Sequence, residues 1–452
     1  MITTAPLQLL QAFRQRLVGI FPRRADALFE LIDALLLTLD PRSPVELSTS
    51  PAFRRRFSMV YDALRQGQVD SELARQLLAT AEPTDAIEVE GYAVYPLDST
   101  IMPRPDAETL EDRGRVYSAS KDGTVPGHQY SWLGRVIAPG QSWFAPRDVE
   151  RIATSTTPAA VAAEQVKRLA LTLAASALAV IVADSHYAKR VFLAVFVNQP
   201  NLHILVRLAC NRVLYGPPPI VTGQRRRGRP TLHGEKFKLK VPPSPARQAA
   251  WSFGKASVRL SAWTQLHFKD LPTLVGLVIR VEFLTATGQA MYQRPLWLFW
   301  SGPSTISLEA LCLMYLLRFG IEHFFRFAKR RMGLLIAHTP DLTASMNWVW
   351  VVALAYTQLL LARPLVTAQP RPWDPKSLRD PQRPLTPGQV RLAWLAFSLG
   401  LGTPAQTPQP SGKAPGRAPG FHPHPRQRYP VVSKKQKQAA ETTAEGTRPV
   451  EL

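Results

Sequence analysis

Cysteine is scarce in this chain, occurring only as Cys210 and Cys312 among 452 residues. A small fold held together by several disulfides is therefore excluded, and cysteine alone cannot supply the four ligands of a structural zinc site. Low cysteine usage is typical of proteins that fold in a reducing compartment. We therefore expect a cytoplasmic protein.

Acidic residues are also under-represented. The chain has 33 Asp and Glu against 55 Lys and Arg, which gives a formal net charge of +22. A surface with this excess attracts polyanions over roughly a Debye length, about 8 Å at physiological salt. Nucleic acid is the first candidate partner. A membrane-surface protein would need an amphipathic helix or a lipidation signal, and neither stands out.

The sequence has no long uninterrupted membrane-type run. Of two apolar stretches, residues 169–183 are shorter than the ~20 residues that a transmembrane helix needs. The other, residues 348–362, contains Thr357 and Gln358 and stops at Arg363. The N-terminus shows no signal-peptide pattern. We expect both stretches to be core elements, and no membrane association.

The N-terminal part of the chain has a helical pattern. Apolar residues recur at helical spacing through residues 1–85, which predicts a helical N-terminal domain. Arginines decorate this region, either as a solvated basic face or as a module that grips the DNA backbone. They are Arg14, Arg16, Arg23, Arg24 and Arg54 to Arg56.

From about residue 90 the pattern changes to that of an α/β protein. Strands are predicted at residues 92–97, 129–137, 142–144, 178–183 and 202–208, and helices at residues 158–173 and 189–197. Strands and helices in this order predict a mixed sheet with helices packed on its faces. We assign residues 90–211 to the first part of this core.

The rest of the chain divides into four segments. Residues 212–298 predict a β-rich insertion with a basic loop, since they combine a proline cluster, a basic run and the strand-like residues 277–284 and 296–300. Helical stretches at residues 307–331 and 344–362 place the second part of the core at residues 299–365. Residues 366–402 predict a C-terminal helical segment. Residues 403–452 have few large apolar side chains to offset the entropy of folding and predict a disordered basic tail.

A stripe of polar side chains marks the predicted helix at residues 307–331. At 100° per residue, Tyr315, Arg318, Glu322 and Lys329 lie within roughly 60° of arc on one face. The stripe has one carboxylate, two cations and one phenol. This set favours a site in which Glu322 holds a metal ion while its neighbours bind phosphates. An ordinary amphipathic helix also has such pairs.

Two aspartates end apolar strands upstream of this stripe. Asp98 follows residues 92–97, and Asp184 closes residues 178–183. Carboxylates are unfavourable in strands and costly to bury unpaired, and a divalent cation would compensate them. Neighbouring strands lie about 4.8 Å apart, so both could share metal ions with a glutamate from a packed helix. Each aspartate alone also fits a cap of the following turn or helix.

Taken together, these segments resemble the bacterial insertion-sequence DDE transposases, in the branch with a Tyr-Arg-Glu-Lys signature. The signature is Tyr, two residues, Arg, three residues, Glu, six residues and Lys, and the stripe matches it without a gap. Residues 97–100 and 182–187 resemble its two aspartate segments. The intervals, 184 − 98 = 86 and 322 − 184 = 138, are similar to those of members with a β-rich insertion before the glutamate. The resemblance covers residues 90–365.

The resemblance implies a ribonuclease H-like core with two Mg²⁺ ions, replaceable by Mn²⁺, on Asp98, Asp184 and Glu322. It implies DNA cleavage at the ends of a mobile element and strand transfer into a target, with Tyr315, Arg318 and Lys329 on DNA phosphates. The implied partner is double-stranded DNA. A homodimer in the DNA complex and a bacterial, nucleoid-associated protein are also implied.

Three further features have a functional and an ordinary interpretation. The run with Arg225, Arg226, Arg227 and Arg229 resembles the core of an AT-hook, which enters a narrow minor groove, and it also fits a solvated loop. His186 is either a metal or phosphate neighbour or structural. Four tryptophans could include one that stacks on a flipped base, and each also fits plain core packing. They are Trp251, Trp263, Trp297 and Trp300.

Two other functions compete with transposition. A domesticated or inactive transposase would bind DNA without cutting it, although decay gives no reason to retain three acids. A junction resolvase would cut DNA without strand transfer. If replacing Glu322 by Gln abolishes cleavage but not DNA binding, the protein is an active enzyme and not an inactive transposase. If it joins a 3′-hydroxyl end to target DNA, it is a transposase and not a resolvase.

Overall fold

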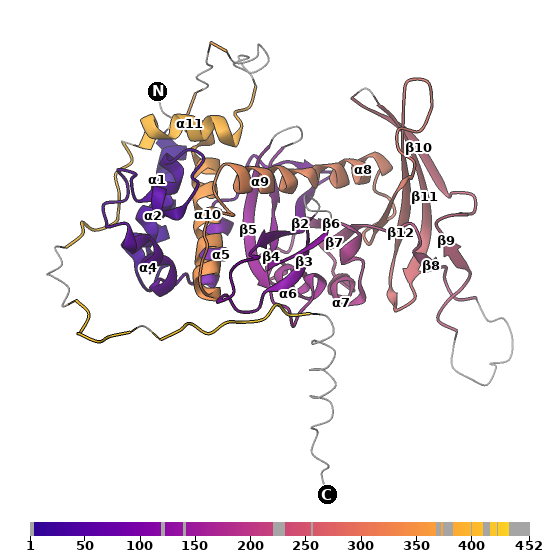
Figure 1. Cartoon of the computed structure of the whole chain (residues 1–452). Helices are drawn as coiled ribbons and strands as arrows, with labels where there is room; N and C mark the ends of the chain where they lie inside the picture. Colours follow the sequence, from indigo (N-terminus) through magenta and orange to yellow (C-terminus); the bar gives the residue numbers. More distant parts are fainter. Residues whose placement is uncertain are drawn as a thin grey trace, which may run out of the picture.

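The computed structural model shows an elongated molecule in which a central sheet lies between a helical region and a set of β-hairpins (Figure 1). It describes residues 4–118, 123–138, 142–219, 231–254, 256–367, 372–373, 383–398, 400–409, 416–422 and 424–433. Helices α8 and α9 lie on one face of the sheet, and α6 and α7 on the other (Figure 1).

The helical region combines helices from the two ends of the chain. Its N-terminal elements are α1 (Thr4–Gly19), α2 (Ala25–Leu37), α3 (Pro44–Leu47), α4 (Ser58–Gln66) and α5 (Ser71–Thr80). The C-terminal elements are α10 (Leu342–Ala362), η4 (Arg363–Leu365) and α11 (Pro387–Ser398). Local capping explains where some of these helices begin. Asp70, for example, accepts hydrogen bonds from the first-turn N–H groups of Glu72 and Leu73.

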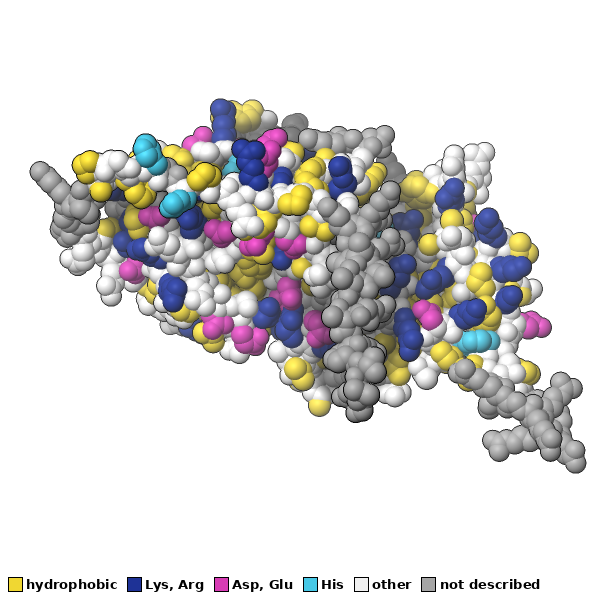
Figure 2. Space-filling model, turned by 60° about the horizontal axis from the view of Figure 1, so that its bottom comes forward, with side chains coloured by type: hydrophobic (Ala, Val, Ile, Leu, Met, Phe, Trp, Pro, Cys, Tyr) yellow, Lys and Arg dark blue, Asp and Glu magenta, His cyan; other side chains and the backbone are white. Residues whose placement is uncertain are grey.

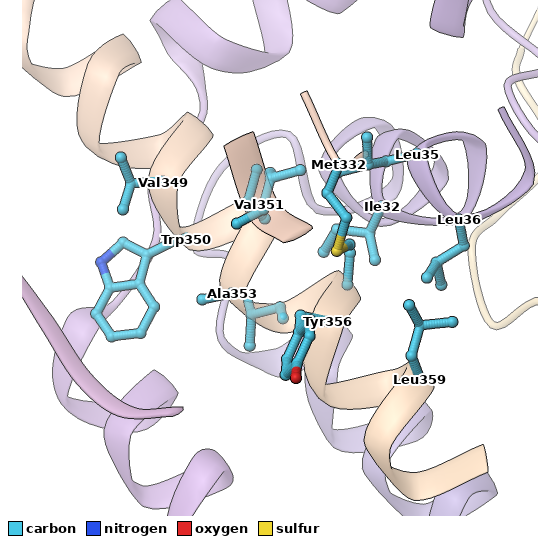
Figure 3. Packing of buried hydrophobic residues seen from close by; sticks show 14 of the residues in the cluster. Ile32, Leu35, Leu36, Met332, Val349, Trp350, Val351, Ala353, Tyr356 and Leu359 are labelled. Carbon is cyan, nitrogen blue, oxygen red and sulfur yellow. The ribbon is translucent and has the colours of Figure 1, made fainter. Parts of the chain in front are cut away.

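Helix α10 forms the centre of this region. Figure 3 shows Leu36 of α2 near Leu359 of α10, and both belong, with Leu35 and Tyr356, to one buried apolar cluster. Leu342–Leu365 is the one helix among the described residues that is long and apolar enough to cross a membrane, and 83% of its apolar window is buried. The apolar side chains of this helix are therefore buried against the rest of the protein.

Buried polar contacts tie the N-terminal helices to α10. Asn347 donates hydrogen bonds of 2.9 Å to the carbonyl oxygens of Leu64 and Gly67. Arg14 is buried, pairing with Asp33 at 2.7 Å and donating to Gln358 at 2.6 Å. Since these partners come from both ends of the chain, the N-terminal helices and α10 share one core.

Several N-terminal arginines are committed to internal ion pairs. Besides Arg14, both Arg54 and Arg55 contact Glu30, whose carboxylate is almost completely buried. A buried carboxylate needs such partners because desolvation penalises its charge. These three arginines stabilise the helical region, whereas Arg16 and Arg56 are exposed.

The central sheet begins with strands β1 (Glu88–Val89), β2 (Tyr92–Pro103), β3 (Gly114–Ser118), β4 (Gly123–Val136) and β5 (Phe144–Ile152). After α6 (Pro158–Ala170) it continues with β6 (Leu178–Ala183), η2 (Ser185–Tyr187), α7 (Arg190–Leu193), η3 (Ala194–Phe196) and β7 (Leu202–Arg207). Strand β2 pairs antiparallel with β4 and parallel with β6, and β6 pairs parallel with β7. The predicted mixed α/β sheet with flanking helices is confirmed.

The β-rich segment extends this sheet. It contains β8 (Val213–Tyr215), β9 (Lys236–Lys238), β10 (Arg247–Phe253), β11 (Ala256–Phe268), β12 (Leu271–Leu284) and β13 (Leu296–Trp300). Strand β13 pairs antiparallel with the core strand β7, giving the order β3-β4-β2-β6-β7-β13-β12-β11-β8-β9. The hairpins are therefore joined to the core by main-chain hydrogen bonds.

The helical stretch predicted at residues 307–331 is divided in two, as α8 (Leu308–Leu317) and α9 (Phe319–Arg330). Arg318 lies between them with helical backbone angles, φ −52° and ψ −29°. The two helices continue across the sheet toward α10 and α11 (Figure 1).

Parts of the segment predicted to be a disordered tail lie against the folded protein. The carbonyl oxygen of Ala405 accepts a hydrogen bond of 2.8 Å from Arg54. Further along, the N–H groups of Tyr429 and Val432 donate to the carbonyl oxygens of Glu108 and Arg113, both at 2.8 Å. Hydrogen bonds to the backbone of the segment, which its low apolar content does not reveal, hold these parts.

A buried histidine in the sheet predicts a pH dependence of stability. The Nε2–H group of His128 donates to the carbonyl oxygen of Glu111 at 2.9 Å, and burial lowers the pKa of this histidine from 6.5 to about 4. Between these pH values the unfolded chain binds a proton that the folded chain does not. The free energy of unfolding therefore falls as the pH drops from 6.5 to 4, by roughly 3 kcal/mol for this group.

The measurement is urea denaturation of the wild type and of His128→Gln, which keeps a donor for Glu111, at several pH values in this range. We expect a shallower loss of stability in the variant. An identical pH dependence of the two proteins would contradict the assignment.

Candidate active site

The register of two parallel strands brings the predicted aspartates together. Strands β2 and β6 pair from Tyr92↔Leu178 to Pro96↔Val182, a constant offset of 182 − 96 = 86. The same offset separates Asp98 from Asp184, since 184 − 98 = 86. Asp184 follows the last residue of β6 directly, so continuing this register would place it opposite Asp98, and its charge raises the pKa of Asp98.

Asp98 differs from its expected place in one respect. We predicted it at the end of a strand, but it lies inside β2, opposite Trp132 of β4. Strand β2 continues because β4 pairs with it as far as Pro103, beyond the point where β6 ends. Asp98 is thus supported by β4 on one side, while the other side faces the turn that starts at Asp184.

Asp184 also serves as the cap that its position after a strand suggested. Its Oδ1 accepts a hydrogen bond of 2.8 Å from the N–H of His186, at the start of η2. Its Oδ2 lies 3.1 Å from Nδ1 of His186. The imidazole is 84% exposed, so His186 is a solvent-facing neighbour of the carboxylate.

Arg318 connects the sheet to α9. Its Nη1 lies 2.6 Å from Oδ2 of Asp98, and its Nη2 lies 2.7 Å from Oε1 of Glu322. One planar guanidinium therefore binds one oxygen from each of two carboxylates that are distant in the sequence. This bridge places Glu322 at the same site as Asp98.

Burial and charge oppose each other at this site. Burial raises the pKa of Asp98, Arg318 lowers it, and Asp184 raises it, with a net increase. Burial lowers the pKa of Arg318, but Asp98, Tyr315 and Glu322 outweigh that effect, so the guanidinium stays charged. A crowded, partly desolvated set of carboxylates with a single bridging cation favours additional positive charge.

The remaining members of the stripe are close to the same carboxylates. Burial lowers the pKa of Lys329, and the nearby charge of Asp98 opposes this shift. Tyr315 is buried, which raises the pKa of its hydroxyl, while the charge of Arg318 lowers it. The structure therefore brings Tyr315, Arg318, Glu322 and Lys329 together with both aspartates.

One residue of the site was not singled out from the sequence. Tyr187 is 1% exposed, and burial followed by the charge of Asp98 raises the pKa of its hydroxyl. Its side chain packs against Phe192, with ring centroids 5.6 Å apart. The available signal was its position shortly after Asp184, within the segment that resembles the second aspartate motif.

The remaining predicted residues are the arginines of the basic run and four tryptophans. Arg225, Arg226, Arg227 and Arg229 lie outside the described residues, so their groove contact stays a prediction. Trp263, Trp297 and Trp300 are buried in the core, which favours packing over base stacking, and Trp251 is half-buried on the edge strand β10.

A known protein family matches more than half of the chain. The sequence matches the family described as DDE superfamily endonuclease over residues 16–269, which is 269 − 16 + 1 = 254 of the 452 residues. The chain belongs to the DDE superfamily endonucleases. The matched segment of this endonuclease contains Asp98 and Asp184 and ends before Glu322. The structural evidence for Glu322 is therefore its bridge through Arg318.

Among solved structures, this DDE endonuclease is similar to a piggyBac transposase in a synaptic complex with hairpin DNA, determined by cryo-EM. The alignment has 11% identity and a TM-score of 0.34, and it covers 84% of this chain and 82% of the other. No curated protein matches the sequence.

The acidic residues of the endonuclease fit a divalent metal by donor type. Carboxylate oxygens are the ligands that Mg²⁺ prefers, and burial of Asp98 favours a compensating cation. Among the described residues, no three His, Cys, Asp or Glu side chains are close enough to hold an ion as they stand. Arg318 explains this spacing, because its guanidinium lies between Asp98 and Glu322.

Proposed function

We propose that this DDE endonuclease is a bacterial insertion-sequence transposase, which cuts DNA at the ends of its element and joins them to target DNA. The observation that carries the proposal is the convergence of Asp98 on β2, Asp184 directly after the neighbouring strand β6, and Glu322, which Arg318 ties to Asp98. The order β5-β4-β2-β6-β7, with the first three strands antiparallel and the last two parallel, supports a ribonuclease H-like core.

In this proposal Asp98, Asp184 and Glu322 hold two Mg²⁺ ions, or Mn²⁺ in their place. Such ions, when bound, activate the attacking oxygen and stabilise the leaving oxygen of an in-line phosphoryl displacement. Bound ions would take the place of Arg318 at Asp98 and Glu322. The guanidinium of Arg318 is a planar fork that matches two phosphate oxygens, and it lies beside both carboxylates.

Lys329 and Tyr315 complete the phosphate-binding side of the site. The half-buried Lys329 lies near Asp98 and would present a compact positive charge to non-bridging oxygens. The buried hydroxyl of Tyr315 is a hydrogen-bond donor at neutral pH, since its pKa is raised. Donors and charges fixed before the substrate arrives stabilise the developing charge without reorganisation.

The surface supports double-stranded DNA as the partner. Figure 2 shows Lys and Arg side chains gathered over the β-rich segment at the right of the view, with few acidic side chains among them. Exposed cations of this part of the chain are Lys236, Lys238, Lys240, Arg259 and Lys269. We propose that DNA ends are bound by two copies of the chain, as a homodimer in the nucleoid of a bacterial cytoplasm.

The proposed function is tested with a duplex copied from the DNA that flanks the coding sequence. The transposase should nick or cut this duplex in the presence of Mg²⁺ and join its 3′-hydroxyl end to a target plasmid. Cleavage without joining would indicate a resolvase-type nuclease instead. Binding without cleavage would indicate an inactive, DNA-binding relative.

Replacing Arg318 by Gln tests the bridge without relying on activity. Loss of the guanidinium leaves Asp98 without its ion pair, so the free energy of unfolding without metal should fall by about 1–3 kcal/mol. Because Arg318 no longer competes with the metal, added Mg²⁺ should raise the Tm of the variant more than that of the wild type. Differential scanning fluorimetry with and without Mg²⁺ measures both effects.

Arg115→Gln is the matched control for this experiment, because Arg115 is exposed on β3 and forms no ion pair with any described residue. Its Tm should respond to Mg²⁺ as the wild type does. Equal Mg²⁺ shifts for the wild type and Arg318→Gln would contradict competition between arginine and metal.

A further inference from the structure

Helix α9 also lines a cavity next to the stripe of Tyr315, Arg318, Glu322 and Lys329. A cavity of about 630 Å³ separates the C-terminal half of α9 from the start of α11 and the residues that follow α2. We call it the α9–α11 pocket and define it by its principal lining residues, His323, Arg326, Arg330, Arg331, Asp40 and residues 386–389, 391 and 392. Both helices lie on the upper side of the molecule in Figure 1.

The arginines of the pocket lie on the same polar face of α9 as the stripe. At 100° per residue, Arg326 and Arg330 are rotated by about 40° and 80° from Glu322, while Arg318 and Lys329 are about 40° and 20° to its other side. The face of α9 therefore runs without interruption from the carboxylate site into the pocket. Along the axis, Glu322 and Arg330 are about 12 Å apart at 1.5 Å per residue.

The cations on α9 are not used by the fold. Arg326 and Arg330 are both exposed, and neither forms a hydrogen bond or an ion pair with any other described residue. Arg331 differs, since it pairs with Asp40, the one acidic side chain among the residues that line the pocket. Two adjacent arginines one helical turn apart, without acidic partners, leave a net positive surface open to an anion.

The opposite wall is held firmly in place. Arg391 of α11 is 4% exposed and donates to the carbonyl oxygens of Leu35 and Thr38, at the C-terminal end of α2. Thr386 and Gln389 cap the start of α11 reciprocally. The wall that faces Arg326 and Arg330 is thus built from a docked helix whose N-terminal end carries partial positive charge.

We propose that the α9–α11 pocket binds the sugar–phosphate backbone of the DNA substrate next to the phosphate that is cut. This inference rests on the proposed function and adds the path of one DNA strand along α9. A strand rises about 3.4 Å per nucleotide in B-DNA, so the roughly 12 Å from Glu322 to Arg330 spans about three to four nucleotides. Arg326 and Arg330 each bind one of the phosphates in that interval.

The experiment measures how the affinity of the full chain for a fluorescein-labelled duplex depends on salt, without Mg²⁺. Each phosphate contact contributes about −0.9 to the slope of log K against log [salt]. The double variant Arg326→Ala/Arg330→Ala should make this slope shallower by about 2 and weaken binding near 100 mM salt roughly tenfold. Its Tm should equal that of the wild type, because neither side chain has a structural partner among the described residues.

A double variant elsewhere provides the control. Arg115→Ala/Lys167→Ala removes two exposed cations, from β3 and from α6 on the face of the sheet away from α9, and its slope should match the wild type. An unchanged slope for the Arg326→Ala/Arg330→Ala variant, or an equal change in the control, would overturn the inference. Cleavage assays of the same wild-type preparation report separately on the proposed function, since they depend on the carboxylates.

Discussion

Glu322→Gln is expected to reduce Mg²⁺-dependent DNA cleavage by about 10³-fold or more, with DNA affinity unchanged within a few-fold. The substitution replaces an anionic metal ligand by a neutral amide of nearly the same shape. Two-metal catalysis supplies several kcal/mol of transition-state stabilisation, and about 4 kcal/mol corresponds to 10³ in rate. Asp98→Asn and Asp184→Asn should have the same effect, because the three residues act as one set. The measurement is the single-turnover rate of cleavage of the duplex copied from the flanking DNA.

The matched control is Glu164→Gln. Glu164 is exposed on α6, where it pairs with Lys167, and its replacement removes the same charge on the other face of the sheet. Cleavage by this variant should stay within about twofold of the wild type. If Glu322→Gln cleaves as fast as Glu164→Gln, Glu322 has no part in catalysis.

The second large effect concerns the shared helical core. Leu354 is completely buried in α10, in the apolar cluster that also contains side chains of the N-terminal helices. Leu354→Ala should lower the free energy of unfolding by about 2–5 kcal/mol, through lost apolar burial and the cavity left behind. Since the N-terminal helices share this core, fluorescence and circular dichroism should report one common transition in urea.

Leu171→Ala is the control for this change. Leu171 is 87% exposed at the end of α6, so its truncation should alter the stability by no more than about 0.5 kcal/mol. Equal stabilities of the two variants would contradict the packing of α10. Separate transitions for the N-terminal helices and the sheet would contradict the shared core.

The sequence predicted those elements whose limits are set by local chemistry. Strand β6 occupies Leu178–Ala183 as expected, because an apolar run there stops at a charged residue. Strand β13 occupies Leu296–Trp300 for a similar reason. By contrast, the division between α8 and α9 was not predicted. Arg318 keeps helical backbone angles, and no breaker stands at that position.

The site was predicted by residue type and spacing, but its arrangement depends on contacts distant in sequence. Asp98 lies inside β2 rather than at a strand end because of its pairing with β4, which a local pattern cannot show. The bridge from Arg318 to Asp98 joins distant parts of the chain and arises only when α9 packs on the sheet. The burial of Tyr187 and the free cations of the α9–α11 pocket likewise follow from packing.

The central claim is that Asp98, Asp184 and Glu322 hold divalent metal together. Anomalous diffraction from crystals of the DNA complex soaked in Mn²⁺ tests it most directly. We predict anomalous peaks in contact with all three carboxylates, with Arg318 moved from Asp98 to a DNA phosphate. Saturating Mn²⁺ without a peak at Asp98 and Asp184, and with the Arg318 bridge intact, would contradict the account.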